Sequence, residues 1–227
     1  MENIIKLKRK EQPLVVSVVK DEFIEASEKA FDCAFNGVSE FYPWEKPIIP
    51  EKFNIGVIVG SSGSGKSTLL KEFGIEKKIW WDRKKPIVSW FKSPDEAINK
   101  LSAVGLNTIP SWYKPFHVLS NGEKFRAELG AKLEDYAVID EYTSVVDRNV
   151  AKASSMALNK YIKKNGLTNI VLCTCHEDVL DWLEPDWVIN TDEGNFYPDF
   201  FQLGQISSWK SIAQKTISGP CLKTIII

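Results

Sequence analysis

The sequence is poor in the residues that build metal centres and disulfide frameworks. Its 227 residues include two histidines and four cysteines, and no two cysteines form a C-x-x-C pair. Cys173 and Cys175 lie in one apolar run, where the alternation of a strand places both on the same side. Buried free thiols are therefore expected there, rather than a disulfide or metal ligands.

Long apolar segments and an excess of charge are also missing. No apolar stretch is long enough to cross a bilayer, and the first residues lack the apolar core of a signal peptide. The net charge of −1 gives no overall basic field of the kind that attracts nucleic acid. With 44% hydrophobic and 26% charged residues, the composition is ordinary for one large globular domain. We expect a cytoplasmic protein without membrane insertion.

One stretch has the pattern of a phosphate-binding loop. Ile55–Val59 is a β-branched run typical of a buried parallel strand. The pattern G-x-x-x-x-G-K-S follows at residues 60–67, and the next residues open a helix that Gly74 can cap. The N–H groups of such a loop converge on one anion at the positive end of the helix dipole. The residues expected to bind nucleotide are Gly60, Ser61, Ser62, Gly63, Ser64, Gly65, Lys66, Ser67 and Thr68.

Side chains in and beyond this loop have predicted roles. Lys66 would reach the β- and γ-phosphates, and the Ser67 hydroxyl would bind Mg²⁺. Asp140 and Glu141 end a short apolar strand, and such an edge faces the ligand crevice of a parallel sheet. One carboxylate suits a hydrated Mg²⁺ and the next suits a water molecule that it orients. His176 follows another core strand, at 169–173, where its side chain can reach a γ-phosphate.

The N-terminal part is predicted to hold a strand at Pro13–Lys20 and a helix within Asp21–Phe35. Residues 41–50 are rich in proline and aromatic residues and are expected to be irregular. A flat ring suits adenine, but core or surface packing explains each ring equally well. The candidates for stacking on adenine are Phe35, Phe41, Tyr42 and Trp44.

Residues 79–86 combine Trp80 and Trp81 with three basic residues, at 83–85. Such interleaving can bind single-stranded nucleic acid, although a solvated loop with half-buried tryptophans is commoner. A strand at Ile87–Phe91 and a helix capped by Ser93 follow. The other expected elements are a helix from Ser120 to about Leu133, a helix at 149–164, a last strand at 187–190, a turn at 192–195 and a short helix around 208–214.

Taken in order, these motifs resemble the ATP-binding-cassette class of P-loop ATPases, over roughly residues 50–192. The ordered set comprises the P-loop, Leu119–Glu123, Ile139–Glu141, Ser144-x-x-Asp147 and His176. The resemblance implies an ATP hydrolase in which Asp140 is the Walker B aspartate on Mg²⁺, Glu141 is the general base and His176 is the switch histidine.

The resemblance also implies a head-to-tail homodimer that forms with ATP. Ser120 and Gly122 would belong to a signature loop, which binds the ATP held by the P-loop of the partner subunit. Arg126 matches the arginine that closes the extended signature motif, and Asp147 matches the residue of the D-loop.

The sequence departs from the family pattern at three points. Asn121 replaces the first glycine after the signature serine. No glutamine occurs from Thr68 to Leu119, so the glutamine that links Mg²⁺ to the partner domain is missing and a residue near Ser93 would have to replace it. Ser120 follows Lys66 by only 54 residues (120 minus 66), fewer than in transporter cassettes. The last two departures fall on the surface that transporters use for coupling.

These features favour a soluble, non-transporter member, similar to the phage and bacterial cassette ATPases often fused to an acetyltransferase-like domain. The predicted fold is an α/β P-loop NTPase with a mostly parallel sheet flanked by helices. It would occupy residues 1–195, with a shortened helical insert at about 80–120 and a tail of unassigned role at 196–227. The expected function is Mg²⁺-dependent ATP hydrolysis coupled to a protein or nucleic-acid partner. An ATP-gated DNA clamp and, less favoured, a transporter subunit are the alternatives.

Overall fold

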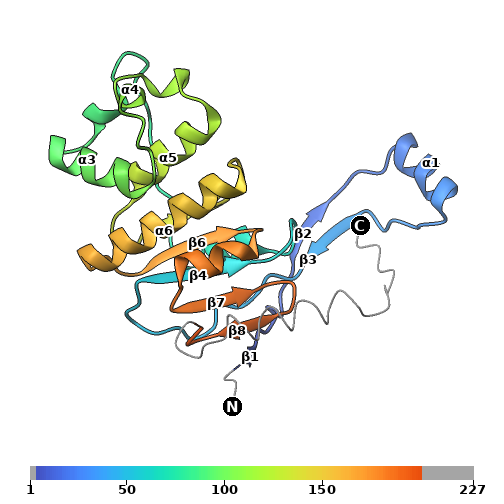
Figure 1. Ribbon diagram of the computed structural model, residues 1–227. Coiled ribbons are helices and arrows are strands. Elements are labelled where there is room, and N and C mark those ends of the chain that lie inside the picture. Colours follow the sequence, from blue (N-terminus) through green and yellow to red (C-terminus); the bar gives the residue numbers. More distant parts are fainter. Residues whose placement is uncertain (1–3, 201–227) are drawn as a thin grey trace.

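The computed structural model describes residues 4–200, which form a six-stranded sheet with helices on both faces (Figure 1). The strand order is β1-β8-β7-β4-β6-β5, in which β4 to β7 are parallel and β1 and β8 are antiparallel at one edge. The strands are β1 (Ile5–Lys6), β4 (Ile55–Val59), β5 (Val138–Ile139), β6 (Ile170–Thr174), β7 (Trp187–Asn190) and β8 (Asn195–Tyr197). The predicted mostly parallel sheet is confirmed.

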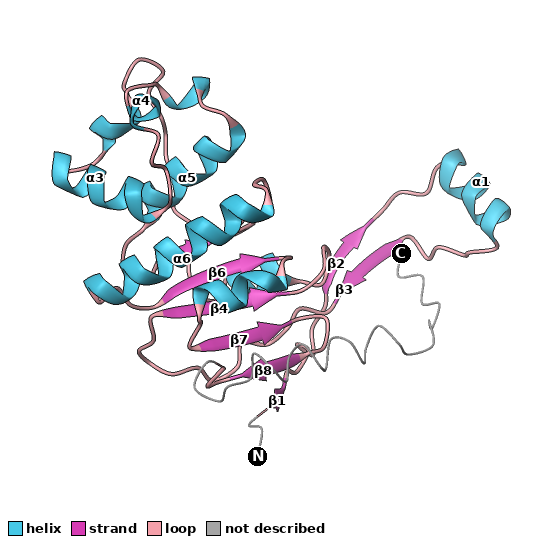
Figure 2. Ribbon diagram, in the orientation of Figure 1, coloured by secondary structure: helices cyan, strands magenta, loops and turns pink. Residues whose placement is uncertain are grey.

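Seven α-helices occur among the described residues, with three short 3-10 helices. They are α1 (Glu22–Phe31), α2 (Lys66–Leu70), η1 (Ile87–Trp90), α3 (Pro94–Ala103), α4 (Ile109–Trp112), η2 (Phe116–Val118), α5 (Asn121–Lys132), α6 (Arg148–Asn165), η3 (Glu177–Val179) and α7 (Leu180–Leu183). Helix α2 ends before Gly74, the predicted cap, because Lys71 closes it. Figure 2 shows α3, α4 and α5 grouped beyond α6, away from the sheet.

The central strand β4 is buried along its whole length because it packs on two layers. Val57 joins an apolar cluster with Leu158 of α6, whereas Ile58 joins a second cluster with Leu69 of α2. Alternate residues of a strand point to opposite faces, so this β-branched run needs apolar side chains at every position. The continuous apolar pattern therefore identified a strand covered on both faces.

The predicted strand at Ile87–Phe91 is wrong, because most of this segment forms the 3-10 helix η1. Ile87 is buried, and its amide donates to the carbonyl oxygen of Lys114 at 3.0 Å. The apolar pattern thus reflects burial in the helical layer rather than pairing in a sheet. The helix expected after it is confirmed as α3, and the Ser93 hydroxyl accepts from the amide of Glu96 at 3.1 Å.

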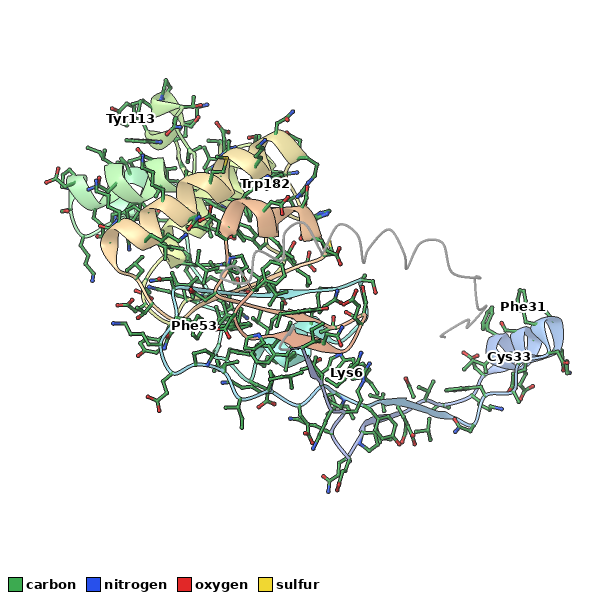
Figure 3. All side chains as sticks on the ribbon, turned by 60° about the horizontal axis from the view of Figure 1, so that its bottom comes forward. Lys6, Phe31, Cys33, Phe53, Tyr113 and Trp182 are labelled. Carbon is green, nitrogen blue, oxygen red and sulfur yellow. The ribbon has the colours of Figure 1, made fainter. Side chains whose placement is uncertain are left out.

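An antiparallel ribbon of β2 (Leu14–Ser17) and β3 (Val38–Phe41) carries α1 away from the body of the molecule (Figure 1). Phe31 and Cys33 lie at the far end of this arm (Figure 3). Asp21 caps α1, and no residue of α1 is buried. The predicted strand and helix therefore exist but lie outside the core. Phe41, expected in an irregular segment, is the last residue of β3.

Strand β8 continues the chain past residue 195, the predicted end of the ATPase domain. Phe196 and Phe200 are both buried in the core. The short helix expected around 208–214 and Cys221 lie outside the described residues. Cys173 is a buried free thiol, as predicted, but Cys175 is exposed because β6 ends at Thr174. Within residues 4–200, no helix is long and apolar enough to cross a membrane.

Candidate functional site

Three neighbouring strands end at one edge of the sheet and deliver the predicted catalytic segments there. The parallel register aligns Val59 of β4 with Thr174 of β6, and Ile139 of β5 with Leu172 of β6. The P-loop, the two acids and His176 follow these strand ends directly. Carboxyl ends of parallel strands are the usual place for a ligand crevice. The topology therefore collects the three motifs around the end of β6.

The buried thiol of Cys173 lies near charged side chains from two of these motifs. Burial raises its pKa, and the carboxylates of Asp140 and Glu141 raise the pKa further, whereas the ammonium of Lys66 lowers it. One point at the end of β6 thus lies within electrostatic reach of the P-loop lysine and of both acids. The structure brings together residues that are more than seventy positions apart in the sequence (140 minus 66).

The P-loop is held in a shape that only glycine permits at its last turn. Gly65 has a φ of 97°, and a Cβ there would lie 2.6 Å from ring carbon Cζ of Phe41. Lys66 begins α2 directly afterwards, so the first N–H groups of this helix have no intrahelical partner. The Lys66 ammonium donates to the carbonyl oxygen of Ser61 at 2.6 Å, within the loop. This arrangement suits a bound phosphate chain.

The P-loop is held in place by Asp192 and Thr191, which the sequence did not assign to the site, and by Trp44, which it offered only as a ring for adenine. The carboxylate of Asp192 accepts hydrogen bonds from both the amide and the hydroxyl of Ser61, each at 2.7 Å. The hydroxyls of Thr191 and Ser64 lie 2.7 Å apart, and the indole of Trp44 donates to the Ser64 carbonyl oxygen at 3.0 Å. The sequence held one signal for Asp192. It is an acid just after the last parallel strand, and parallel strands of one sheet end at the same edge as the P-loop.

The backbone after β5 is strained where the two acids lie. Glu141 has a φ of 54°, in the left-handed region that a glutamate rarely adopts. Its amide donates to Asp140 at 2.8 Å, and the amide of Tyr142 donates to the Cys173 carbonyl oxygen at 2.8 Å. The buried Tyr142 hydroxyl lies 2.8 Å from that of Ser155 and anchors the turn. Strain of this kind is found at functional sites, where the surrounding structure maintains it.

Ser67 and Asp140 offer one hydroxyl and one carboxylate to a metal ion. The described residues contain no group of three or more His, Cys, Asp or Glu side chains that could hold a metal. Mg²⁺ retains several waters and commonly takes its remaining ligands from one or two carboxylates and the phosphates of a substrate. The sparse donor set therefore fits an ion that arrives with a nucleotide.

No family model and no curated protein matches this sequence. Solved structures do match its fold. The post-hydrolysis dimer of the ATP-binding cassette MJ0796 with ADP and Pi has a TM-score of 0.51 and 14% identity, covering 81% of this chain and 93% of that one. The archaeal ribosome recycling factor aABCE1, solved with the stalk protein aP1, has a TM-score of 0.50 and 16% identity, covering 66% and 38%. The chain has an ATP-binding-cassette fold.

In this cassette fold the signature segment begins α5, in the helical layer. The amide and the hydroxyl of Ser120 both donate to the carboxylate of Glu123 at 2.9 Å, so these residues form a capping box. The Ser111 hydroxyl donates to the same carboxylate, and this bond, followed by that from Ser120, lowers the pKa of Glu123 to about 2. Ser120 is exposed, and its hydroxyl bonds within α5 rather than to the P-loop of its own chain.

Of the two other residues matched to signature and D-loop positions, Arg126 lies within α5 and Asp147 lies at the start of α6. Asp147 caps α6 and accepts from the amides of Asn149 and Val150 at 2.9 and 3.1 Å. Arg126 is half-buried, and burial lowers the pKa of its guanidinium, while Glu123 and Asp147 act in the opposite direction. The charges of Arg126 in α5 and of Asp147 at the start of α6 thus lie within electrostatic reach of each other.

The four aromatic residues predicted to stack on adenine lie in different parts of the fold. Phe41 and Tyr42 line a hollow of about 700 Å³ beside Ser61–Ser64, and Phe41 also borders a smaller hollow at Lys66 and Thr68. Trp44 is buried, and the guanidinium of Arg9 covers its ring at 3.4 Å. Phe35 lies in the arm, where its amide bonds to Glu28. Only Phe41 and Tyr42 therefore border the hollows at the phosphate loop.

The two tryptophans of the basic stretch have different environments. Trp81 is half-buried, stacks in parallel on Phe116 at 4.8 Å and meets Trp90 edge-on at 5.3 Å. Phe116 therefore covers one face of the Trp81 ring, and the binding of nucleic acid at this stretch stays a prediction. Trp80 is 82% exposed. The Ser93 hydroxyl caps α3, and the residue near it that replaces the missing glutamine stays a prediction.

Proposed function

We propose that this chain is an Mg²⁺-dependent ATPase that works as a head-to-tail homodimer. The proposal is carried by the parallel register of β4, β5 and β6, which brings Lys66, Asp140 and Glu141 to one edge of the sheet. A lysine for phosphate, a carboxylate for the metal and a second carboxylate for water are the parts that phosphoryl transfer to water needs. The likeness in fold to the ATP-binding cassette MJ0796, solved after hydrolysis with ADP and Pi, supports it.

Catalysis would consist of positioning and electrostatic stabilisation. Lys66 and the amides of the P-loop hold the phosphates and take up the charge that develops on them. Ser67 and Asp140 would hold Mg²⁺, which would supply positive charge to the phosphates. Glu141 orients the attacking water and accepts its proton, and His176 donates to the γ-phosphate.

The dimer follows from where Ser120 lies. Ser120 and Gly122 belong to the helical layer, and the hydroxyl of Ser120 bonds only within α5. A second chain rotated by half a turn would bring its own Ser120 to the P-loop of the first, since such an interface repeats itself symmetrically. Each ATP would then lie between two chains.

We further propose that the protein works in the cytoplasm, outside a transporter, and couples ATP hydrolysis to a partner. The short segment between the P-loop and Ser120 supports this, because it leaves little structure to dock on a membrane subunit. A nucleic-acid clamp is the second candidate. The observation in its favour is the exposed ring of Trp80 next to Lys77 and Lys78 around one hollow.

Two variants test the ATPase proposal. Lys66→Ala should abolish or severely weaken ATP binding measured by calorimetry, because it removes the fixed cation on the phosphates. Glu141→Gln should bind ATP normally and lose about 10²- to 10⁴-fold in phosphate release, as expected for loss of a general base. Lys71→Ala is the control, since Lys71 is exposed one turn further on. Unchanged ATP affinity in Lys66→Ala would exclude this P-loop as the nucleotide site.

A further inference from the structure

Glu76 connects the helical layer to the catalytic strand end. One oxygen of its carboxylate, Oε1, accepts from the ammonium of Lys132 at 2.9 Å and from the backbone amide of Asp140 at 3.4 Å. Glu76 lies in the connector after α2, Lys132 is the last residue of α5, and Asp140 follows β5. A single oxygen atom of Glu76 thus contacts both the end of α5 and the residue after β5, which lie 56 and 64 residues away in the sequence.

Within residues 4–200, the contact is one of the two best-shielded ion pairs, together with that of Lys100 and Glu96. The side chain of Lys132 is 14% exposed and that of Glu76 is 32% exposed, whereas the pair of Lys77 and Glu134 beside it is about half exposed on both sides. Water screens exposed pairs strongly and shielded pairs much less. Lys132 also approaches Glu128, but at 3.7 Å. Glu76 is therefore the principal partner of Lys132.

Helix α5 connects this contact to Ser120. The helix begins next to Ser120 and ends at Lys132, a rod of about 18 Å at 1.5 Å per residue. A hydrogen-bonded helix of three turns moves as a unit, so a shift of its first turn also displaces its last. A hollow of about 360 Å³ lies between α5 and the acids and is lined by Glu76, Lys132, Asp140 and Glu141, which leaves room for such a shift.

We propose that Glu76 is a positioning residue that couples the two ATP sites of the dimer. This inference rests on the proposed function, in which Ser120 binds the ATP of the partner subunit. ATP bound at Ser120 pulls α5, Lys132 transmits the shift to Glu76, and Glu76 adjusts the amide of Asp140. Because Glu141 follows at a strained φ, a small rotation of this turn changes where its carboxylate lies. Each chain thereby senses at its own acids whether the opposite site is filled.

The test separates positioning from binding. Glu76→Gln and Lys132→Met should each lower kcat by about tenfold, as removal of residues that orient metal ligands commonly does. The ATP affinity should stay within about twofold, and the dependence of rate on ATP should lose cooperativity. Lys132→Arg should restore both, because it keeps the ion pair. Glu128→Gln is the matched control, since Glu128 approaches Lys132 but not Asp140, and it should behave as the wild type.

Thermal unfolding of each variant shows whether the fold survives, and Lys132→Arg provides a well-folded comparison. Wild-type kcat and cooperativity in Glu76→Gln would overturn the coupling role. Mixing Lys66→Ala with Ser120→Arg tests the composite site without touching Glu76. If the mixture regains activity and Glu76→Gln is unimpaired, the coupling is wrong and the proposed function stands. If the mixture stays inactive even when both chains also carry Glu76→Gln, which removes the coupling, Ser120 does not serve the partner's ATP, and both are overturned.

Discussion

Asp192 fixes the start of the phosphate loop by binding Ser61 at two points. Its two carboxylate oxygens accept from the amide and the hydroxyl of Ser61, each at 2.7 Å. Asp192 lies just beyond the end of β7, which neighbours the strand that leads into the loop. Hydrogen bonds to a charged acceptor are stronger than neutral ones. The loop is thus ordered by a strand end 131 residues away in the sequence.

Asp192→Ala should therefore weaken ATP binding by about three- to tenfold, because the loop start must be ordered on binding. Isothermal calorimetry with Mg-ATP measures this. Asp192→Asn is the control: its amide oxygen still accepts from the Ser61 amide, while the negative charge is gone. Tighter binding by both variants would show that the carboxylate acts mainly by repelling phosphate.

Phe41 should carry the stacking of adenine. Its ring lies against Gly65 and borders both hollows at the loop. Stacking of a base on an aromatic ring contributes about 1–3 kcal/mol, so Phe41→Ala should weaken ATP binding by about 5- to 100-fold, and Phe41→Tyr should not. Fluorescence titration with a labelled nucleotide measures the affinity. A large loss in Tyr42→Ala with little in Phe41→Ala would transfer the role to Tyr42.

The active site should be built from two chains, which complementation can show. Ser120→Arg blocks the opposite site and leaves its own P-loop intact. Lys66→Ala disables its own P-loop and leaves Ser120 able to serve the opposite site. In a heterodimer of these inactive variants both lesions fall in one site and the other is wild-type. For equal amounts that pair at random, up to about a quarter of the wild-type rate should return if the sites work independently, and less if they are coupled.

ATP should also drive dimerisation of the slow Glu141→Gln form, visible by light scattering. Each inactive variant measured alone over the same concentration range is the control for the mixture. A protein that stays monomeric with saturating Mg-ATP, and hydrolyses it at a rate that dilution does not change, would contradict the composite site.

The signature helix should loosen in acid. Hydrogen bonds from Ser111 and Ser120 lower the pKa of Glu123 to about 2 in the folded protein, from an ordinary value of 4.5. A lowered carboxyl pKa stabilises the fold above the unfolded value, and this stabilisation is lost as the pH falls from about 4.5 towards 2. Glu123→Gln cannot titrate. Its deficit in unfolding free energy should be present at pH 7 and shrink across that window in urea titrations.

The binding of nucleic acid at the basic stretch should depend on Trp80 and not on Trp81. Trp80→Ala should remove most of the binding of a fluorescent single strand at low salt, and added salt should weaken it steeply. Trp81 packs on Phe116, so Trp81→Phe is the control that retains a ring inside the helical layer. No binding by the wild type at low salt, with or without ATP, would exclude the clamp.

Local patterns in the sequence determined the elements of the site. The apolar run at Ile55–Val59, the glycine loop after it and the acids at Asp140 and Glu141 each follow from chemistry within ten residues. Strand burial, helix capping and phosphate binding are set by neighbours in the chain, so these features could be predicted. The same reasoning failed at Ile87, because an apolar run does not show whether its backbone pairs in a sheet or turns within a helical layer.

Only the tertiary structure decided which distant groups meet. Nothing near Asp192 in the sequence indicates Ser61, and nothing near Glu76 indicates Lys132 or Asp140. These contacts arise from the strand order and from the position of α5. Both depend on how the whole sheet packs, not on the spacing of residues along the sequence. The sequence by itself therefore determined the phosphate loop, the acids and the α/β architecture. The supports of the loop, the choice among the aromatic rings and the link from α5 to the acids required the fold, because each joins residues that only long-range packing brings within hydrogen-bond distance.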